Sequence, residues 1–138
     1  MTRMLVLALI VLAAFAFAAD VIAEDPPALV LDHQEIVARA RSGGLRDASL
    51  TYPDDRAVLR GRVRYLGLWW PIRVEAVFVR EGARVRMRAL ELFVRGRAMP
   101  ARRGDADARI ARLVDEESAA VRVEIRDGGR VVYVQGVE

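Results

Sequence analysis

Few residues in this sequence have side chains that could carry chemistry. The only histidine is His33, and Asp32 and Glu35 are its acidic neighbours along the chain. Because the chain has no cysteine and no second histidine, this imidazole lacks the partners that complete a metal shell. Aspartate, histidine and glutamate also recur at helix starts, where they cap free N–H groups or favour the helix dipole. We therefore interpret His33 as structural, and we predict no metal and no cofactor.

The candidate nucleophiles and the acid pairs are equally isolated. Ser42, Ser49 and Ser118 each lack the Gly-x-Ser-x-Gly setting of a nucleophile elbow. The adjacent acids Asp54-Asp55 and Glu116-Glu117 stand in polar, solvent-like segments. Neither a phosphate-binding glycine-rich loop nor a dinucleotide fingerprint is present. The sequence predicts a protein that is not an enzyme, since a hydrolase would need His33 beside an acid and a nucleophile in one cleft.

The basic residues are 22 arginines and no lysine, against 19 acids, which gives a net charge of +3. Such a small surplus supports only weak attraction to anionic surfaces. Arg60, Arg62 and Arg64 alternate with apolar residues, as on the solvated face of a sheet. The functional alternative for these three arginines is an anionic lipid headgroup. Nucleic acid is not expected as a partner, because stacking aromatics are not interleaved with them.

The segment Leu68-Trp69-Trp70-Pro71-Ile72 is the most distinctive local feature. Neighbouring residues of a strand point to opposite faces, so Trp69 and Trp70 cannot both enter the same core. One indole is then expected at a surface or at the mouth of a groove, where it suits a lipid interface. Coverage of that indole by a helix or a loop is the alternative.

The chain of 138 residues opens with a segment typical of export. Arg3 precedes an apolar run from Met4 to Ala16. Ala16-Phe17-Ala18 fits a signal-peptidase site, and Val21-Ile22-Ala23 is a weaker second candidate. We predict a signal peptide at residues 1–23, with an uncleaved anchor as the alternative, although about 16 apolar residues fall short of the roughly 20 that span a bilayer. A linker at 24–30 then leads into one domain at 31–138. Both alternatives place the domain outside the cytoplasm, in the periplasm or secreted.

Capping and spacing signals predict two helices in this domain. Asp32 can cap a helix over residues 33–42, which Gly43-Gly44 would end. Asp105 can cap a second helix that follows helical spacing to about Ser118.

Between and after these helices the apolar residues alternate with a period of two, which indicates strands. The expected strands are 48–52, 56–66, 69–80, 83–95, 121–126 and 130–137. Gly61 suggests a bulge or a close approach, and a change of phase near Leu90 suggests a bulge. The fold class is therefore α+β: an antiparallel sheet of about six strands packed on two helices, in the order helix, four-strand meander, helix and terminal hairpin.

The order of short motifs resembles the LmeA-like family of exported phospholipid-binding proteins. The similar segments are Leu31-Asp32-His33-Gln34-Glu35-Ile36, Gly43-Gly44-Leu45, Leu59-Arg60-Gly61-Arg62-Val63, Gly67, Pro71-Ile72-Arg73-Val74, Val94-Arg95-Gly96 and Met99-Pro100. The match covers residues 31–100. It implies a curved sheet wrapped on a helix, of the tubular lipid-binding kind, with an apolar groove for acyl chains.

The first hypothesis is therefore a non-enzymatic lipid-binding protein of the cell envelope, with a phospholipid or other acyl lipid as its partner and a homodimer left open. The groove candidates are Leu59, Val63, Ile72, Val74, Phe78, Val85 and Met87. A solid core built from these residues would count against the groove. The second hypothesis is a protein-interaction or scaffold module with a filled core and an exposed apolar patch at Trp69 and Trp70.

Overall fold

The computed structural model describes residues 28–136, so the predicted signal peptide lies outside the described residues. The helices are α2 (His33–Ser42), the short 3-10 helix η1 (Pro100–Arg102) and α3 (Arg103–Ile110). The strands are β1 (Ala28–Asp32), β2 (Arg46–Thr51), β3 (Ala57–Tyr65), β4 (Leu68–Glu81), β5 (Arg84–Val94), β6 (Arg97–Ala98), β7 (Asp115–Glu117), β8 (Arg122–Arg126), β9 (Arg130–Tyr133) and β10 (Gln135–Gly136). The predicted α+β class is confirmed.

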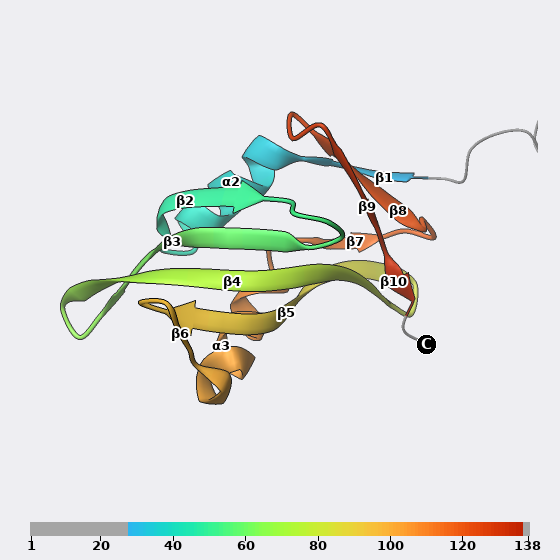
Figure 1. The fold of residues 1–138 in the computed structure, drawn as a ribbon. Coiled ribbons are helices and arrows are strands. Elements are labelled where there is room, and N and C mark those ends of the chain that lie inside the picture. Colours follow the sequence, from blue (N-terminus) through green and yellow to red (C-terminus); the bar gives the residue numbers. More distant parts are fainter. Residues whose placement is uncertain (1–27, 137–138) are drawn as a thin grey trace, which may run out of the picture.

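The larger sheet has the order β2-β3-β4-β5-β6, with antiparallel neighbours throughout. β7 pairs with β5, and the two-residue β10 runs parallel to β4. The sheet curls over the helices (Figure 1), and α2 packs beside β2 while α3 packs on β5. Apolar side chains from both sheets and both helices meet in one buried core.

The predicted terminal hairpin forms, but in a second, smaller sheet. β8 and β9 pair antiparallel, and β1 joins β8 in parallel, which gives the order β1-β8-β9. The predicted linker at residues 24–30 is therefore too long, because residues 28–30 already belong to β1. The physical reason is that the backbone of β1 finds its hydrogen-bonding partner far along the chain.

The first helix agrees with its prediction at both ends. The Asp32 carboxylate accepts hydrogen bonds from the backbone N–H groups of Gln34 (2.9 Å) and Glu35 (3.3 Å). Helix α2 ends at Ser42, and Gly43 donates to the Arg39 carbonyl (3.0 Å). Cap chemistry in the sequence was thus sufficient to place this element.

The second helix is shorter than predicted and begins earlier. Helix α3 ends at Ile110, and Asp105 lies in its first turn and does not cap it. The Asp107 carboxylate instead accepts from the backbone N–H of Ala89 (2.8 Å) and from the Arg88 guanidinium, which ties the helix to β5. Residues 115–117 leave the helical path and pair with β5 as strand β7. Tertiary pairing therefore overrides the helical spacing of this segment.

Two irregularities predicted from the sequence are present. The pairing of β4 with β5 shifts so that Leu90 has no partner, which is the expected bulge. At Gly61, an added Cβ would lie 2.5 Å from the Leu45 side chain and 2.9 Å from the Arg46 carbonyl oxygen. Glycine is therefore required here for the close approach of the segment that leads into β2.

Candidate functional site

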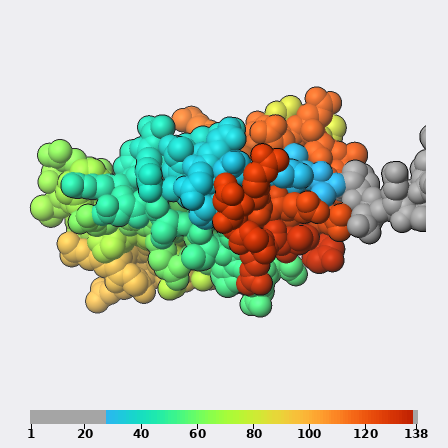
Figure 2. Space-filling model, turned by 90° about the horizontal axis from the view of Figure 1, so that it is seen from above, coloured from blue at the N-terminus to red at the C-terminus, as the bar shows by residue number. Residues whose placement is uncertain are grey.

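The most exposed large apolar side chain of the described residues, Leu66, lies at the end of the β3–β4 hairpin, and we name residues 63–72 the hairpin tip. Its exposed fractions are 51% for Tyr65, 80% for Leu66, 56% for Leu68 and 37% for Trp69. Leu68 shares the inward face of β4 with Phe78, which is 0% exposed, so burial on that face is lost towards the tip. The space-filling view shows the hairpin tip at one end of the molecule, next to the segment around β6 and η1 (Figure 2).

The turn at the hairpin tip has backbone strain at Leu66, although this residue is exposed and is not held in place by burial. Leu66 and Gly67 both have positive φ, 51° and 76°, as in a two-residue turn of type I′. Asn, Asp or Gly is the usual residue at the first position, and a left-handed conformation costs a leucine roughly 1 to 2 kcal/mol. An exposed leucine there contributes nothing to the core.

Five non-glycine residues of the described chain have positive φ. Three are aspartates, which tolerate this conformation through local hydrogen bonds. The other two are Leu66 and Arg95, and both lie at the same end of the sheet. Strained residues of unfavourable type are more frequent at functional positions than elsewhere.

The aromatic rings of the hairpin tip are each covered by an arginine. The guanidinium carbon of Arg95 lies 4.0 Å from the ring centroid of Trp70, and that of Arg46 lies 5.2 Å from Trp69. Arg102 approaches Tyr65 in the same way at 5.7 Å. These are cation–π distances.

The two tryptophans have different surroundings. The Trp70 indole N–H donates to the Tyr65 carbonyl (3.0 Å), which braces the hairpin from within. Trp69 lies on the opposite face and is more exposed. Neither indole is among the buried core residues, so the tip presents one braced ring and one accessible ring.

The three predicted headgroup arginines differ in what they contact. Arg60 donates to the Thr51 hydroxyl (3.4 Å), and Arg62 forms an ion pair with Asp47. Arg64 lies opposite Trp69 in the β3–β4 pairing, and no acid in residues 28–136 lies within ion-pair distance of it. Of the three, only Arg64 is therefore unpaired at the hairpin tip.

The alternating arginines of β5, Arg84, Arg86 and Arg88, are neutralised locally. Asp115 accepts hydrogen bonds from Arg84 (2.5 Å) and from Arg86 (3.1 Å). The bond from Arg84, followed by that from Arg86, holds the pKa of Asp115 below its usual value. Glu81 pairs with both Arg86 and Arg88. These guanidiniums are therefore engaged within the fold.

The seven groove candidates lie mostly inside the core. Leu59, Val74, Phe78, Val85 and Met87 are at most 6% exposed. Val63 and Ile72 are partly buried and pack against that core from the side of the hairpin tip. The structure thus brings all seven together as packed core and its margin.

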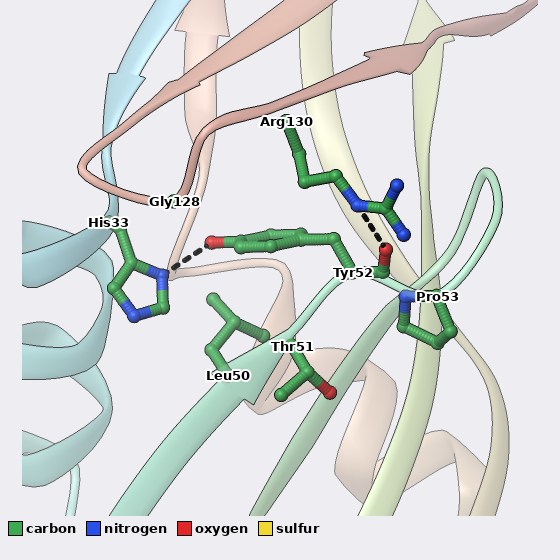
Figure 3. Close-up of a pocket in the computed structure, with 7 residues that line it drawn as sticks. All are labelled: His33, Leu50, Thr51, Tyr52, Pro53, Gly128 and Arg130. Atoms are coloured by element: carbon green, nitrogen blue, oxygen red, sulfur yellow. Dashed lines mark hydrogen bonds between the residues drawn. The ribbon is translucent and has the colours of Figure 1, made fainter.

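A separate pocket of about 440 Å³ lies where α2, β2 and the β8–β9 turn meet (Figure 3). It is lined by His33, Leu50, Thr51, Tyr52, Pro53, Gly128 and Arg130, none of them a groove candidate. The Tyr52 hydroxyl lies 2.9 Å from His33 Nδ1, and the Arg130 Nε donates to the Tyr52 carbonyl (3.0 Å). Burial raises the pKa of Tyr52, so this hydroxyl stays protonated and is available as a hydrogen-bond donor beside His33 Nδ1.

His33 therefore acts as a link between the first helix and β2. Among residues 28–136 no group of three or more histidine or acidic side chains could hold a metal ion. The same part of the chain contains no helix that is long and apolar enough to cross a membrane.

Sequence reasoning identified the two tryptophans and missed three residues of the tip region. Arg46 and Arg95 stack on these rings from β2 and from the β5–β6 turn, which only the three-dimensional pairing brings close. Leu66 could have been noticed as a leucine before glycine in a short turn. Comparisons with protein-family models, with curated proteins and with solved structures found no match to this chain.

Proposed function

We propose that this domain is a non-enzymatic, exported lipid-binding protein that binds the surface of a membrane through its hairpin tip. The observation that carries the proposal is Leu66, an 80% exposed leucine held at positive φ beside the exposed Tyr65, Leu68 and Trp69. Apolar and indole side chains at one end of a molecule suit insertion among lipid headgroups.

The filled core favours a surface site over an acyl-chain groove. Phe78, Val85 and Met87 are fully buried against one another and their neighbours. An acyl chain in their place would require the sheet to open, whereas insertion of the hairpin tip requires no rearrangement. Lipid binding from the first hypothesis is therefore kept, and its location is moved from the inner face to the tip.

The same exposed tip also supports a second candidate function, contact with a protein partner. Exposed apolar patches mark protein interfaces as well as membrane contacts. The arginines around the rings favour an anionic lipid surface by charge attraction, whereas a protein partner would have to present matching acids to them.

Replacing Leu66 by asparagine separates binding from stability. Asparagine tolerates positive φ, so the variant is expected to be as stable as the parent or more stable, by about 1 kcal/mol. Loss of one inserted leucine removes roughly 1.5 to 3 kcal/mol of apolar burial, or about 10- to 100-fold in vesicle affinity. Val131→Asn, which changes an exposed apolar residue of β9, is the matched control and should leave vesicle binding unchanged.

The measurement is co-sedimentation of the purified chain with phospholipid vesicles, with tryptophan emission as a second readout. Insertion of Trp69 predicts a blue shift on binding. If Leu66→Asn binds vesicles as tightly as the parent, the hairpin tip is not the site. If no vesicle composition binds the parent, the protein-partner function becomes the better explanation.

A further inference from the structure

The charged residues around the hairpin tip indicate which class of lipid this surface would bind. The arginines that stack on tip rings or flank them in the paired strands are Arg46, Arg62, Arg64, Arg95, Arg97 and Arg102. The acids that pair with them are Asp47, with Arg62, and Asp105, with Arg102. Within residues 28–136, Arg46, Arg64, Arg95 and Arg97 have no acid at ion-pair distance.

This local surplus is large for a chain with a net charge of only +3. The positive charge is therefore concentrated at one end of the domain, around the exposed apolar residues. A field of this kind attracts an anionic surface far more than the same net charge would if it were evenly spread.

The arginines over the tip rings also have donors available for phosphate. A guanidinium above an aromatic ring keeps its charge, and its N–H groups can still donate to an anion. Arg95 holds this position over Trp70 at a positive φ of 51°, and its backbone N–H donates to the Pro71 carbonyl (3.0 Å). The β5–β6 turn thus holds the Arg95 guanidinium beside Trp70 of the hairpin tip.

We propose that Arg46, Arg64, Arg95 and Arg97 form a collar that binds the phosphate groups of an anionic phospholipid while the hairpin tip inserts between the headgroups. This inference rests on the proposed function and names its lipid class. A second copy of the chain is the poorer occupant, because two collars facing each other would bring like charges together.

The experiment compares vesicles of phosphatidylcholine alone with vesicles that contain about 30% phosphatidylglycerol. Each basic residue near an anionic surface contributes about fivefold in affinity. Arg95→Gln and Arg46→Gln should each weaken binding to the anionic vesicles by about fivefold, and the double variant by about 25-fold. Unfolding curves confirm that each variant remains folded.

Arg126→Gln is the charge-matched control. Arg126 is an exposed arginine of β8 in the smaller sheet, and its loss changes the net charge by the same amount. Its binding should change by less than about twofold, since it is outside the collar. An equal effect of Arg126→Gln and Arg95→Gln would mean that only net charge matters, and would overturn the collar.

Two further outcomes separate this inference from the proposed function. Equal binding to both vesicle types would refute the anionic preference and leave membrane docking intact, whereas binding to neither would refute both. Inorganic phosphate that displaces the protein more strongly than chloride at matched ionic strength would indicate a site for free phosphate and would also overturn the proposal. The collar is supported if phosphate and chloride act alike and the two collar variants alone lose affinity.

Discussion

Phe78→Ala tests whether the inner face of the sheet is a solid core or a groove for acyl chains. Phe78 is the largest fully buried side chain of the described residues and pairs with Met87, which is also 0% exposed. A buried phenylalanine removes roughly 150 to 250 Å² from water, worth up to about 4 to 6 kcal/mol. Alanine keeps the Cβ, so the expected loss in unfolding free energy is about 3 to 5 kcal/mol.

The assay is urea unfolding of the purified chain, followed by tryptophan fluorescence, with and without an acyl lipid. Such a loss is a large share of the roughly 5 to 15 kcal/mol that stabilises a domain. If the alanine variant does not fold, Phe78→Leu should still fold with a smaller loss of about 1 to 2 kcal/mol. Val131→Ala, at an exposed position of β9, is the control and should change stability by less than about 0.5 kcal/mol.

A groove gives a different result. A ring that lines a space for acyl chains would lose little stability when truncated, and added acyl lipid would stabilise the parent chain by mass action. A loss below about 1 kcal/mol for Phe78→Ala, together with stabilisation of the parent by lipid, would refute the solid core and restore the groove. The hairpin tip would then need a different explanation.

Two further predictions concern the packing and the charges of the sheet. Gly61→Ala should destabilise the chain by about 1 to 3 kcal/mol, because its Cβ would meet the Arg46 carbonyl oxygen at 2.9 Å, and this outweighs the roughly 0.4 to 1 kcal/mol that alanine gains through the unfolded state. Urea unfolding measures the loss, and an unchanged or raised stability would mean that the β2 segment yields easily. The pKa of Asp115 is held below its usual value of 3.8 by Arg84 and Arg86, so its contribution is present above about pH 4 and is lost as the pH falls through the lower folded-state pKa. Asp115→Asn should therefore flatten the decrease in melting temperature below pH 4. The control is Glu91→Gln, which changes an exposed carboxylate without an ion pair in residues 28–136 and should not flatten that decrease. Equal behaviour of the two variants would contradict the role given to the Asp115 ion pairs.

The elements that the sequence predicted well are those whose signals are local. Asp32 and Gly43 determine the two ends of α2 through cap hydrogen bonds that involve only neighbouring residues. The alternation around Arg60 and the phase change at Leu90 place β3, β5 and the bulge for the same reason.

The elements that were missed depend on partners distant in the sequence. β1 is a short apolar segment that becomes a strand only because β8 lies beside it. The end of α3 was placed too late because Leu113 and Val114 fit helical spacing, although both are buried outside the helix. Ion pairs of Asp115 with Arg84 and Arg86 of β5 help to hold residues 115–117 as β7, and no local pattern shows these ion pairs. The hydrophobic periodicity identifies the buried residues, but it does not always identify the helix or strand to which they belong.

The exposed hairpin tip follows from a mismatch of lengths that the sequence already contains. β4 has 14 residues, about 46 Å at roughly 3.3 Å per residue of a strand. α2 and α3 have 10 and 8 residues, about 15 and 12 Å at 1.5 Å per residue. Even placed end to end, the two helices would be shorter than the strand, so they cannot cover the whole length of its apolar face. A protein without a use for that overhang would be expected to carry polar residues there, whereas this chain carries Tyr65 and Leu68 on it and Leu66 in the adjoining turn. The core is therefore filled at Phe78 while the tip is left exposed, and the proposed membrane contact depends on that exposure.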